Sequence, residues 1–327
     1  MENPPSQLSV YDAIKAFNRV IEQTRSKNTH HSYAKGLNLF SQSLDEMGIP
    51  VNTASVSQIS EDVLPKFLEK LKDFSPATEQ LYTTTVTRFF HFLMAEKFAD
   101  INLSRMREII RMRNRRFGQR LPQFPREDID KILDFFQTTP PATAGPEHLR
   151  DLRDKSFLIT LADTGLRVHE ACGLRRGDID WNESRAIIIG KGNKQAVIRF
   201  SKRSMIALGE YLKARANLDG SSGRPLSALP LFARHDKGVG KKIKPITPTT
   251  GRNIVDERIR QALGDEAKGR ITPHSFRHYF VTTVLRASGN LKLAQELARH
   301  ANISVTQRYA HISDDELDQG YHEIFEK

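Results

Sequence analysis

Cysteine is almost absent from this 327-residue chain, which contains one, Cys172. A single cysteine excludes an intramolecular disulfide, so a reducing compartment is expected. Its place in an apolar stretch, between Ala171 and Gly173, favours a buried, inert thiol over a nucleophile. The first residues, MENPPSQLSV, have neither the basic start nor the apolar run of a signal peptide, and no apolar run in the chain is long enough to span a bilayer. These absences predict a cytoplasmic protein with no membrane partner.

Metal-binding motifs and acidic residues are scarce as well. The chain has no HExxH, CxxC or paired-acid motif, so the sequence predicts no metal site and no cofactor. Asp and Glu total 39 against 50 Lys and Arg, which leaves a formal net charge of +11. Such a surplus favours a polyanionic partner, because phosphates attract cations and their binding releases condensed counterions. Charge alone is equally compatible with a basic protein that binds no nucleic acid.

The chain is long enough for about two domains, each able to bury its own core. Four short helices are predicted in the first third. Each begins at a residue whose side chain can cap the first turn: Ser9, Thr29, Ser60 and Ser75, the last followed by Pro76. Apolar residues recur at helical spacing after each of these starts. Four such helices predict a compact bundle.

A basic stretch separates this bundle from the rest of the chain. Residues 105–120 contain seven arginines and one acidic residue, and the sequence LPQFPRE with its two prolines follows. We therefore predict a helical domain over 1–112, a basic linker over 113–126 and a second domain over 127–327. The linker is expected to lie along a DNA backbone, although a solvated, charged helix end would have the same composition.

The second domain is predicted to be mostly helical with a small β-sheet. Two β-branched runs flank Gly190–Asn193 (GKGN), which indicates a β-hairpin over 185–200. Residues 219–247, rich in Gly, Pro, Ser and Lys, are predicted as loop. Helices are expected at 127–136, 150–163, 203–216, 248–263, 273–288, 291–299 and 304–310.

Four segments of the second domain carry reactive side chains in a particular order. They are TGLRVHEACGL (164–174), IGKGNK (189–194), HSFRHYF (274–280) and LARHANISVTQRYAHI (297–312). Together they resemble the catalytic domain of the tyrosine recombinases, the family of phage integrases and Xer recombinases. The family order of Arg, Lys, His-x-x-Arg, His and Tyr is filled here by Arg167, Lys191, His274 with Arg277, His300 and Tyr309.

The resemblance covers the whole second domain, and it implies the DNA breaking-rejoining fold. The first domain is similar to the family's core-binding, SAM-like domain in type only. By this resemblance, Tyr309 is the nucleophile that forms a 3′-phosphotyrosine with DNA. Arg167 and Arg277 would clamp the non-bridging oxygens of the attacked phosphate, because forked guanidinium donors match the charge of the transition state. The two arginines would let the enzyme work without a metal. The stored ester makes rejoining independent of ATP.

The remaining members of the set have acid–base or hydrogen-bonding roles. His274 is expected to act as general base or as a donor to the phosphate, and His300 as a further donor. Lys191 would protonate the leaving 5′-oxygen as general acid. Lys194, three residues further in the same turn, is the competing lysine, and the family alignment favours Lys191.

Neighbouring residues are expected to support the site rather than to react. His278 and Glu170 are predicted to orient it. Tyr279, Tyr211 and Tyr321 are alternative tyrosines, and core packing is the better interpretation for Tyr279. The family commonly has Leu-Gly-His before the final helix, where this chain has Ala298-Arg299-His300. Arg299 is expected either on the DNA side or facing solvent.

The resemblance also implies an assembly. Four protomers are expected to pair two specific duplex sites and to exchange strands through a Holliday junction, in DNA integration or in Xer-like chromosome partition. The acidic tail, 314–327, is predicted as an amphipathic helix that packs either on a neighbouring protomer or on its own domain. Two rival functions are a relaxing enzyme of the type IB topoisomerase kind and a non-catalytic DNA-binding protein on an integrase scaffold.

Overall fold

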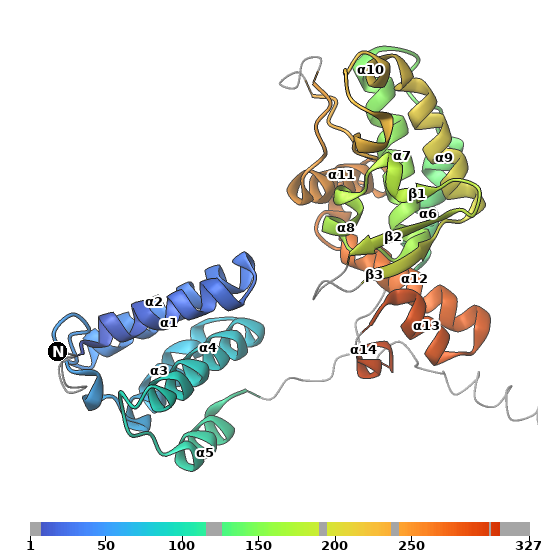
Figure 1. Cartoon of the computed structure of the whole chain (residues 1–327). Coiled ribbons are helices and arrows are strands. Elements are labelled where there is room, and N and C mark those ends of the chain that lie inside the picture. The colour runs from blue at the N-terminus through green and yellow to red at the C-terminus, as the bar shows by residue number, and fades with distance from the viewer. Residues whose placement is uncertain (1–7, 116–125, 190–194, 237–241, 301, 308–327) are drawn as a thin grey trace, which may run out of the picture. The chain divides into compact units, whose positions relative to one another are not determined.

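The computed structural model describes residues 8–115, 126–189, 195–236, 242–300 and 302–307 (Figure 1). The chain divides into two compact units, one within residues 1–120 and one within 121–327. Each unit buries a hydrophobic core of its own. The predicted domain bounds at 112 and 127 stay a prediction, because residues 116–125 lie outside the described ranges. No helix within those ranges is both long and apolar enough to cross a bilayer.

The first unit is a bundle of α-helices joined by short 3₁₀ turns. Its described α-helices are α1 (Val10–Thr24), α2 (Lys27–Glu46), α3 (Leu64–Lys70), α4 (Pro76–Ala95) and α5 (Leu103–Arg113). Its 3₁₀ turns are η2 (Val56–Gln58), η3 (Glu61–Val63) and η4 (Leu71–Asp73).

The helix starts in this bundle follow from side-chain caps. Ser9 and Ser75 cap α1 and α4 as predicted, and Ser60 caps the 3₁₀ turn η3 that leads directly into α3. The prediction that Thr29 caps the second helix is wrong. Ser26 has extended backbone and accepts a hydrogen bond from the Thr29 backbone N–H at 3.3 Å, so α2 begins at Lys27.

Aromatic rings fill the centre of the first unit. Phe40 of α2 is fully buried and contacts Phe67, Phe89 and Phe90 edge-on, with ring centroids 5.1 to 6.3 Å apart. The fifth helix, α5, was not among the four predicted. It joins the bundle through Met106, which is fully buried, so the basic residues up to Arg113 lie in a helix of this unit.

The second unit combines a small sheet with helices on several sides. Its α-helices are α6 (Arg126–Thr138), α7 (Gly145–Thr164), α8 (Val168–Gly173), α9 (Lys202–Ala214), α10 (Ala216–Gly220), α11 (Pro248–Leu263), α12 (Pro273–Ser288), α13 (Leu291–Ala298) and α14 (Ile303–Gln307). The 3₁₀ turns among its described residues are η5 (Arg176–Asp178), η6 (Leu226–Ala228) and η8 (Asp265–Ala267). The strands are β1 (Ile179–Asp180), β2 (Arg185–Ile189) and β3 (Gln195–Arg199).

The sheet is antiparallel in the order β1-β2-β3, which confirms the predicted hairpin and adds a short strand. The pairing of β2 with β3 ends at Ile189 opposite Gln195, and the tip between them lies outside the described residues. Burial alternates along β2: Ala186 and Ile188 face the core, whereas Ile187 and Ile189 are exposed. One face of the sheet therefore covers the core of this unit.

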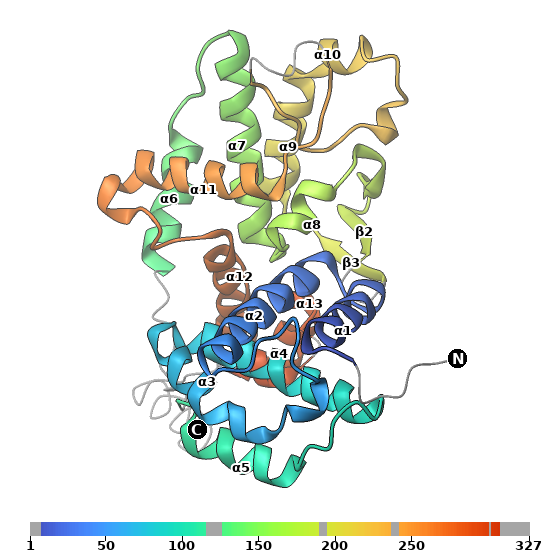
Figure 2. The ribbon, with the colours of Figure 1, turned by 90° about the vertical axis from the view of Figure 1, so that its left-hand side faces the viewer.

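Helix α7 forms the centre of the second unit. Figure 2 shows it beside α9 and crossed by α11, and it also contacts α12. Phe157 of α7 packs edge-on against Phe232, with ring centroids 5.1 Å apart. Phe232 belongs to the stretch predicted as loop. It enters the core because Arg215, fully buried, donates to the backbone carbonyls of Leu231 at 3.0 Å and Pro230 at 2.8 Å.

Gly165 ends α7 and sets the turn toward α8. Its φ is +59°, in the left-handed region that glycine adopts without strain. A Cβ at this position would lie 2.5 Å from Cδ1 of Phe280, a side chain of α12. Only glycine therefore permits both the turn and the close approach of α12.

We predict that Gly165→Ala lowers the free energy of unfolding of the second unit by about 2–5 kcal/mol, from left-handed strain together with overpacking. Urea denaturation curves measure this loss. Gly173→Ala is the matched control, because no atom lies within 4 Å of its added Cβ. An equal effect of the two substitutions would contradict the steric explanation.

Candidate active site

The turn between α7 and α8 positions Arg167. Its backbone is extended, with φ −71° and ψ 149°, and it caps the short helix α8. Glu170, one turn further, accepts hydrogen bonds from the Arg167 backbone N–H at 2.8 Å and from its Nη1 at 2.9 Å. The Arg167 side chain is 38% exposed, whereas that of Glu170 is 4% exposed. Glu170 thus orients Arg167, as expected from the sequence, and leaves part of the guanidinium open to a ligand.

Arg277 joins three segments that are distant in the sequence. It lies on α12 and is only 3% exposed. Its Nη1 donates to the carbonyl of Gly165 at 2.5 Å, and its Nη2 donates to the carbonyl of Ala298 at the end of α13. These bonds bring the residue before Leu166-Arg167 and the residue before Arg299-His300 to the same guanidinium. The predicted pair of arginines is therefore brought together by the fold.

Two histidines lie on the first turns of α12. The rings of His274 and His278 meet edge-on, with centroids 4.3 Å apart and an interplanar angle of 88°. His274 keeps access to solvent, while His278 is partly buried. The helical spacing of four residues places both rings on one face of α12, one turn apart. His278 thus contacts His274, consistent with the expectation that it orients the site.

His300 follows α13 and is held from both sides. Its Nδ1 lies 2.9 Å from the hydroxyl of Thr306, which is fully buried on α14. The carbonyl of His300 accepts a hydrogen bond from Nε2 of Gln295 at 3.0 Å. The ring is thereby fixed by α13 and α14 together.

Burial, together with the charges nearby, keeps the rings of these histidines neutral. Burial lowers the pKa of His300 to about 4, aided by the charges of Arg277 and Arg167. Burial and the neighbouring His274 and Arg277 likewise lower the pKa of His278 to about 4. Partial desolvation, followed by the charges of Arg277 and Arg167, lowers the pKa of His274. Neutral imidazoles can accept or donate a proton in a hydrogen bond at neutral pH.

Unlike the histidines, the carboxylate of Glu170 is held in its charged form by its neighbours. Burial alone would raise its pKa, but the hydrogen bond from the Arg167 backbone and the charges of Arg299 and Arg167 outweigh burial and hold the pKa below its usual range. Glu170 is therefore ionised at neutral pH, as its hydrogen-bonding role toward Arg167 requires.

The fold thus gathers four of the six predicted site residues: Arg167, His274, Arg277 and His300. Lys191, its competitor Lys194, Tyr309, the alternative Tyr321 and the tail 314–327 lie outside the described residues. Their roles stay predictions.

Other side chains that the sequence singled out pack in the core. The hydroxyl of Tyr279 donates to Asp130 at 2.6 Å, and Tyr211 is fully buried. Both therefore have structural partners. Cys172 is buried, and burial raises its pKa to about 12, which confirms the predicted inert thiol.

Of the two alternatives for Arg299, a solvent-facing side chain is wrong, whereas a place on the DNA side stays a prediction. The side chain is 12% exposed and lies against Glu170, with Nη2 3.2 Å from Oε2. The backbone of Arg299 is left-handed, with φ +57° and ψ 45°, which ends α13 as a glycine would. That conformation turns the side chain back toward the α7–α8 turn. In the sequence, the one sign of this arrangement was that Ala298-Arg299-His300 departs from the family's Leu-Gly-His.

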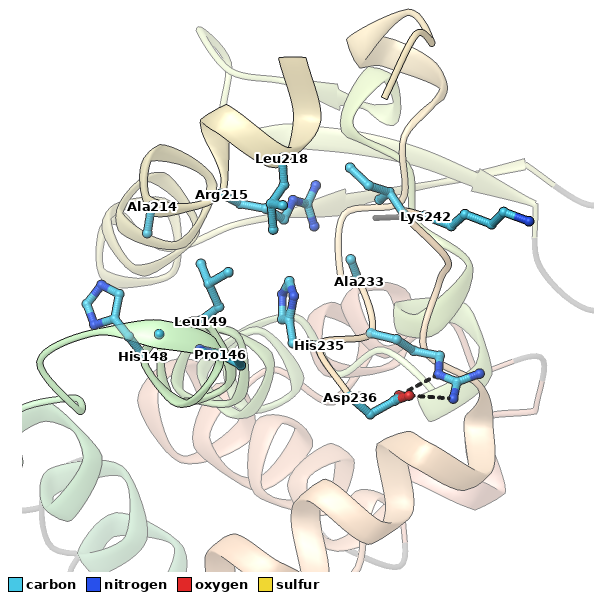
Figure 3. Close-up of a pocket in the computed structure, with 13 residues that line it drawn as sticks. Pro146, His148, Leu149, Ala214, Arg215, Leu218, Ala233, His235, Asp236 and Lys242 are labelled. Atoms are coloured by element: carbon cyan, nitrogen blue, oxygen red, sulfur yellow. Dashed lines mark hydrogen bonds and ion pairs between the residues drawn. The ribbon is translucent and has the colours of Figure 1, made fainter. Parts of the chain in front are cut away.

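A cavity of about 530 Å³ lies elsewhere in the second unit (Figure 3). It is bounded by the start of α7, the junction of α9 with α10, and residues 233–236 and 242–243. Arg234 on its rim pairs with Asp236 at 2.8 Å. None of the candidate active-site residues lines this cavity. Within the described part of the chain, no three His, Cys, Asp or Glu side chains gather so as to hold a metal ion.

Comparison with known proteins defines the family. The Phage integrase family profile matches residues 123–316, and that of the Phage integrase N-terminal SAM-like domain matches residues 14–97. The chain therefore belongs to the phage integrase family of tyrosine recombinases, and it is an enzyme of that class.

Relatives and solved structures agree with this assignment. Tyrosine recombinase XerC of Treponema denticola is 29% identical over 95% of this chain and 97% of its own length. That of Herpetosiphon aurantiacus is 31% identical over 90% and 88%. A crystal structure of XerH site-specific recombinase bound to palindromic difH substrate aligns with a TM-score of 0.69, covering 98% of this chain and 85% of that one, at 18% identity. The last shows a shared fold.

We predict that the imidazole signals of His278 and His300 in the free protein stay unchanged as pH falls from 8 to 5.5, because depressed pKa values keep the rings neutral there. An NMR titration measures this, with each signal assigned from a variant that lacks the ring. The urea-unfolded chain is the control, since ordinary imidazoles titrate near about 6.5. A midpoint near that value in the folded protein would show that the site does not depress these pKa values.

Proposed function

We propose that this tyrosine recombinase cuts duplex DNA by in-line attack of the Tyr309 Oη on a phosphodiester. The bond from Oη to phosphorus forms as the bond from phosphorus to the 5′-oxygen breaks. The phenolic proton is lost to a base, and the 5′-oxygen leaves as a hydroxyl after taking a proton. The product is a 3′-phosphotyrosine that preserves the ester, so the reverse attack by a 5′-hydroxyl rejoins DNA without ATP.

The observation that carries this proposal is the junction at Arg277. Its bonds to the carbonyls of Gly165 and Ala298 bring the segment of Arg167 and the segment of His300 together. Two guanidinium groups that these segments bring to one site would suit the negative charge that builds on the non-bridging oxygens. Each well-placed donor contributes about 3–4 kcal/mol of transition-state stabilisation, so two of them suffice for a large rate enhancement.

We assign the proton transfers to the neutral histidine and to the lysine. The lowered pKa of His274 supports its role as general base, or as a donor to the phosphate. His300 is proposed as a further donor to a non-bridging oxygen. Lys191 at the hairpin tip is proposed as the general acid that protonates the leaving 5′-oxygen, with Lys194 as the alternative.

We propose specific duplex sites as the partner of the chain. The structures similar to this chain include recombinases bound to DNA, among them XerH with palindromic difH substrate. Our expectation is that the helical domain, 1–112, and the basic linker, 113–126, grip the duplex while 127–327 supplies the chemistry. The excess of 50 basic over 39 acidic residues supports such a grip. The cytoplasm is the proposed compartment.

We predict that Tyr309→Phe abolishes the covalent protein–DNA complex while DNA binding persists, because only the nucleophilic oxygen is removed. Denaturing gels on a duplex first identified by footprinting measure it. Tyr279→Phe is the matched control, because it removes a tyrosine hydroxyl that donates to Asp130 of α6, and this variant should still form the complex. A covalent complex with the Tyr309 variant would refute the nucleophile.

Activity assays on the same DNA site distinguish recombination from the two rival activities. Strand exchange between two copies of the site supports the recombinase. Relaxation of supercoils without exchange would support a type IB topoisomerase-like enzyme, and binding without any covalent complex would support a non-catalytic protein.

We further propose that four protomers act on paired sites through a Holliday junction, with the tail, 314–327, packed on the neighbouring protomer. Its acidic and apolar composition fits an amphipathic helix. We predict that deleting 314–327 lowers the cooperativity of binding to paired sites and reduces synapsis, while a single protomer still binds one site. Gel-shift titrations on one-site and two-site DNA measure this. Unchanged cooperativity would place the tail on its own domain.

A further inference from the structure

Arg299 occupies a backbone position that suits glycine. Its φ of +57° and ψ of 45° lie in the left-handed region, where a side chain introduces strain. Among the described non-glycine residues, Lys97 and Ser184 share a positive φ, and Lys97 is exposed. Arg299 alone of these three lies beside the candidate active site. Such outliers persist where the surroundings impose them, and they concentrate at functional sites.

Burial of the Arg299 side chain also lowers the stability of the fold. It is 12% exposed, and its Nε and Nη1 are buried without a hydrogen-bond partner. Burial lowers the pKa of its guanidinium, and the nearby charge of Arg167 lowers it further, while Glu170 opposes both. Left-handed strain and unsatisfied donors both reduce stability, so stability alone does not account for an arginine at this position.

Arg299 contacts a hydrogen-bond partner of each of the two proposed phosphate-binding arginines. Its Nη2 lies 3.2 Å from Oε2 of Glu170, the carboxylate that orients Arg167. The same Nη2 donates to the carbonyl of Gly165 at 3.3 Å, the carbonyl that also accepts from Arg277. Arg299 therefore links the partner of one arginine to the partner of the other.

The contact of Arg299 with Glu170 changes the net charge around Arg167. Glu170 and Arg167 alone form a pair with no net charge, in which the carboxylate draws the guanidinium to itself. With Arg299 on the other side of the carboxylate, the three groups carry a net charge of +1. Glu170 then divides its interaction between two cations, and the 38% exposed Arg167 side chain stays available to an incoming phosphate.

We propose that Arg299 is a positioning residue for strand cleavage: through Glu170 and the Gly165 carbonyl, it holds Arg167 and Arg277 in place and keeps their surroundings cationic. This inference rests on the proposed function above. Arg299 touches neither the phosphate nor the nucleophile in this assignment, and it acts through the groups that do.

Arg299→Gly tests the proposal, because glycine relieves the backbone strain while it removes the guanidinium. We expect the thermal midpoint to stay level or rise and the DNA dissociation constant to change little. The single-turnover cleavage rate at saturating DNA should fall about 10- to 100-fold, as is typical when a group that orients reactive residues is lost. Arg299→Lys should recover part of the rate, since it restores the charge but not the forked geometry.

Two further variants separate positioning from the relief of backbone strain. Ser184→Gly is the matched control: it also replaces a left-handed residue with glycine, at φ +49°, away from the candidate active site, and should leave the cleavage rate unchanged. Glu170→Gln combined with Arg299→Gly should slow cleavage less than the product of the two single effects, because both act through one carboxylate.

The pH profile supplies an independent readout. The charge of Arg299 helps to hold the pKa of Glu170 below its usual range. Without it, the carboxylate should protonate at higher pH, so the acid limb of the cleavage profile of Arg299→Gly should move upward. A merely structural role would leave that limb in place.

The outcomes are distinguishable from those for the proposed function. Wild-type cleavage through Tyr309 together with an undiminished rate for Arg299→Gly would overturn this inference alone. A rate that falls only in parallel with the thermal midpoint or with DNA affinity would also overturn it. A covalent complex that survives Tyr309→Phe would instead refute the proposed function, whatever Arg299 does.

Discussion

The buried guanidinium of Arg277 is the interaction on which the candidate site depends. Its donors reach the carbonyls of Gly165 and Ala298, so one cation fixes the end of α7 and the end of α13 relative to α12. A guanidinium that is 3% exposed is costly unless such partners surround it, which ties the three segments firmly together. The left-handed glycine at 165 makes the contact possible, since a Cβ there would meet Phe280. Arg167 and His300 each lie two residues beyond one of the fixed carbonyls.

Local chemistry made much of this predictable from the sequence. The serine caps at 9 and 75, the β2–β3 hairpin, and helices α11 and α12 follow from side-chain and periodicity rules that act over a few residues. The family was identified from six reactive side chains in a fixed order, each in a segment with recognisable neighbours: Arg167, Lys191, His274, Arg277, His300 and Tyr309. The neutral state of the histidines depends on burial beside two arginines, and the sequence does not contain that information.

The features that the sequence did not predict depend on the backbone conformation and on tertiary contacts. Ser26 rather than Thr29 starts α2, and both residues are acceptable caps by type, so only the backbone conformation decides. Phe232 lies in a stretch rich in loop residues, yet the buried Arg215 holds the preceding carbonyls and draws the ring into the core. One of the two expectations for Arg299 had its side chain facing solvent, and that one is wrong. The left-handed backbone of Arg299 turns the side chain inward, where the guanidinium pairs with Glu170, a residue distant in the sequence.

The most direct test of the central claim asks whether the arginines act on the charge of the attacked phosphate. Arg167→Ala and the unaltered chain would be compared on two substrates, one with an ordinary scissile phosphate and one in which a methyl group replaces a non-bridging oxygen and removes the charge. We predict that the substitution slows cleavage of the ordinary substrate by about 10²- to 10³-fold. On the neutral substrate it should slow cleavage far less. An equal loss on both substrates would contradict the electrostatic role.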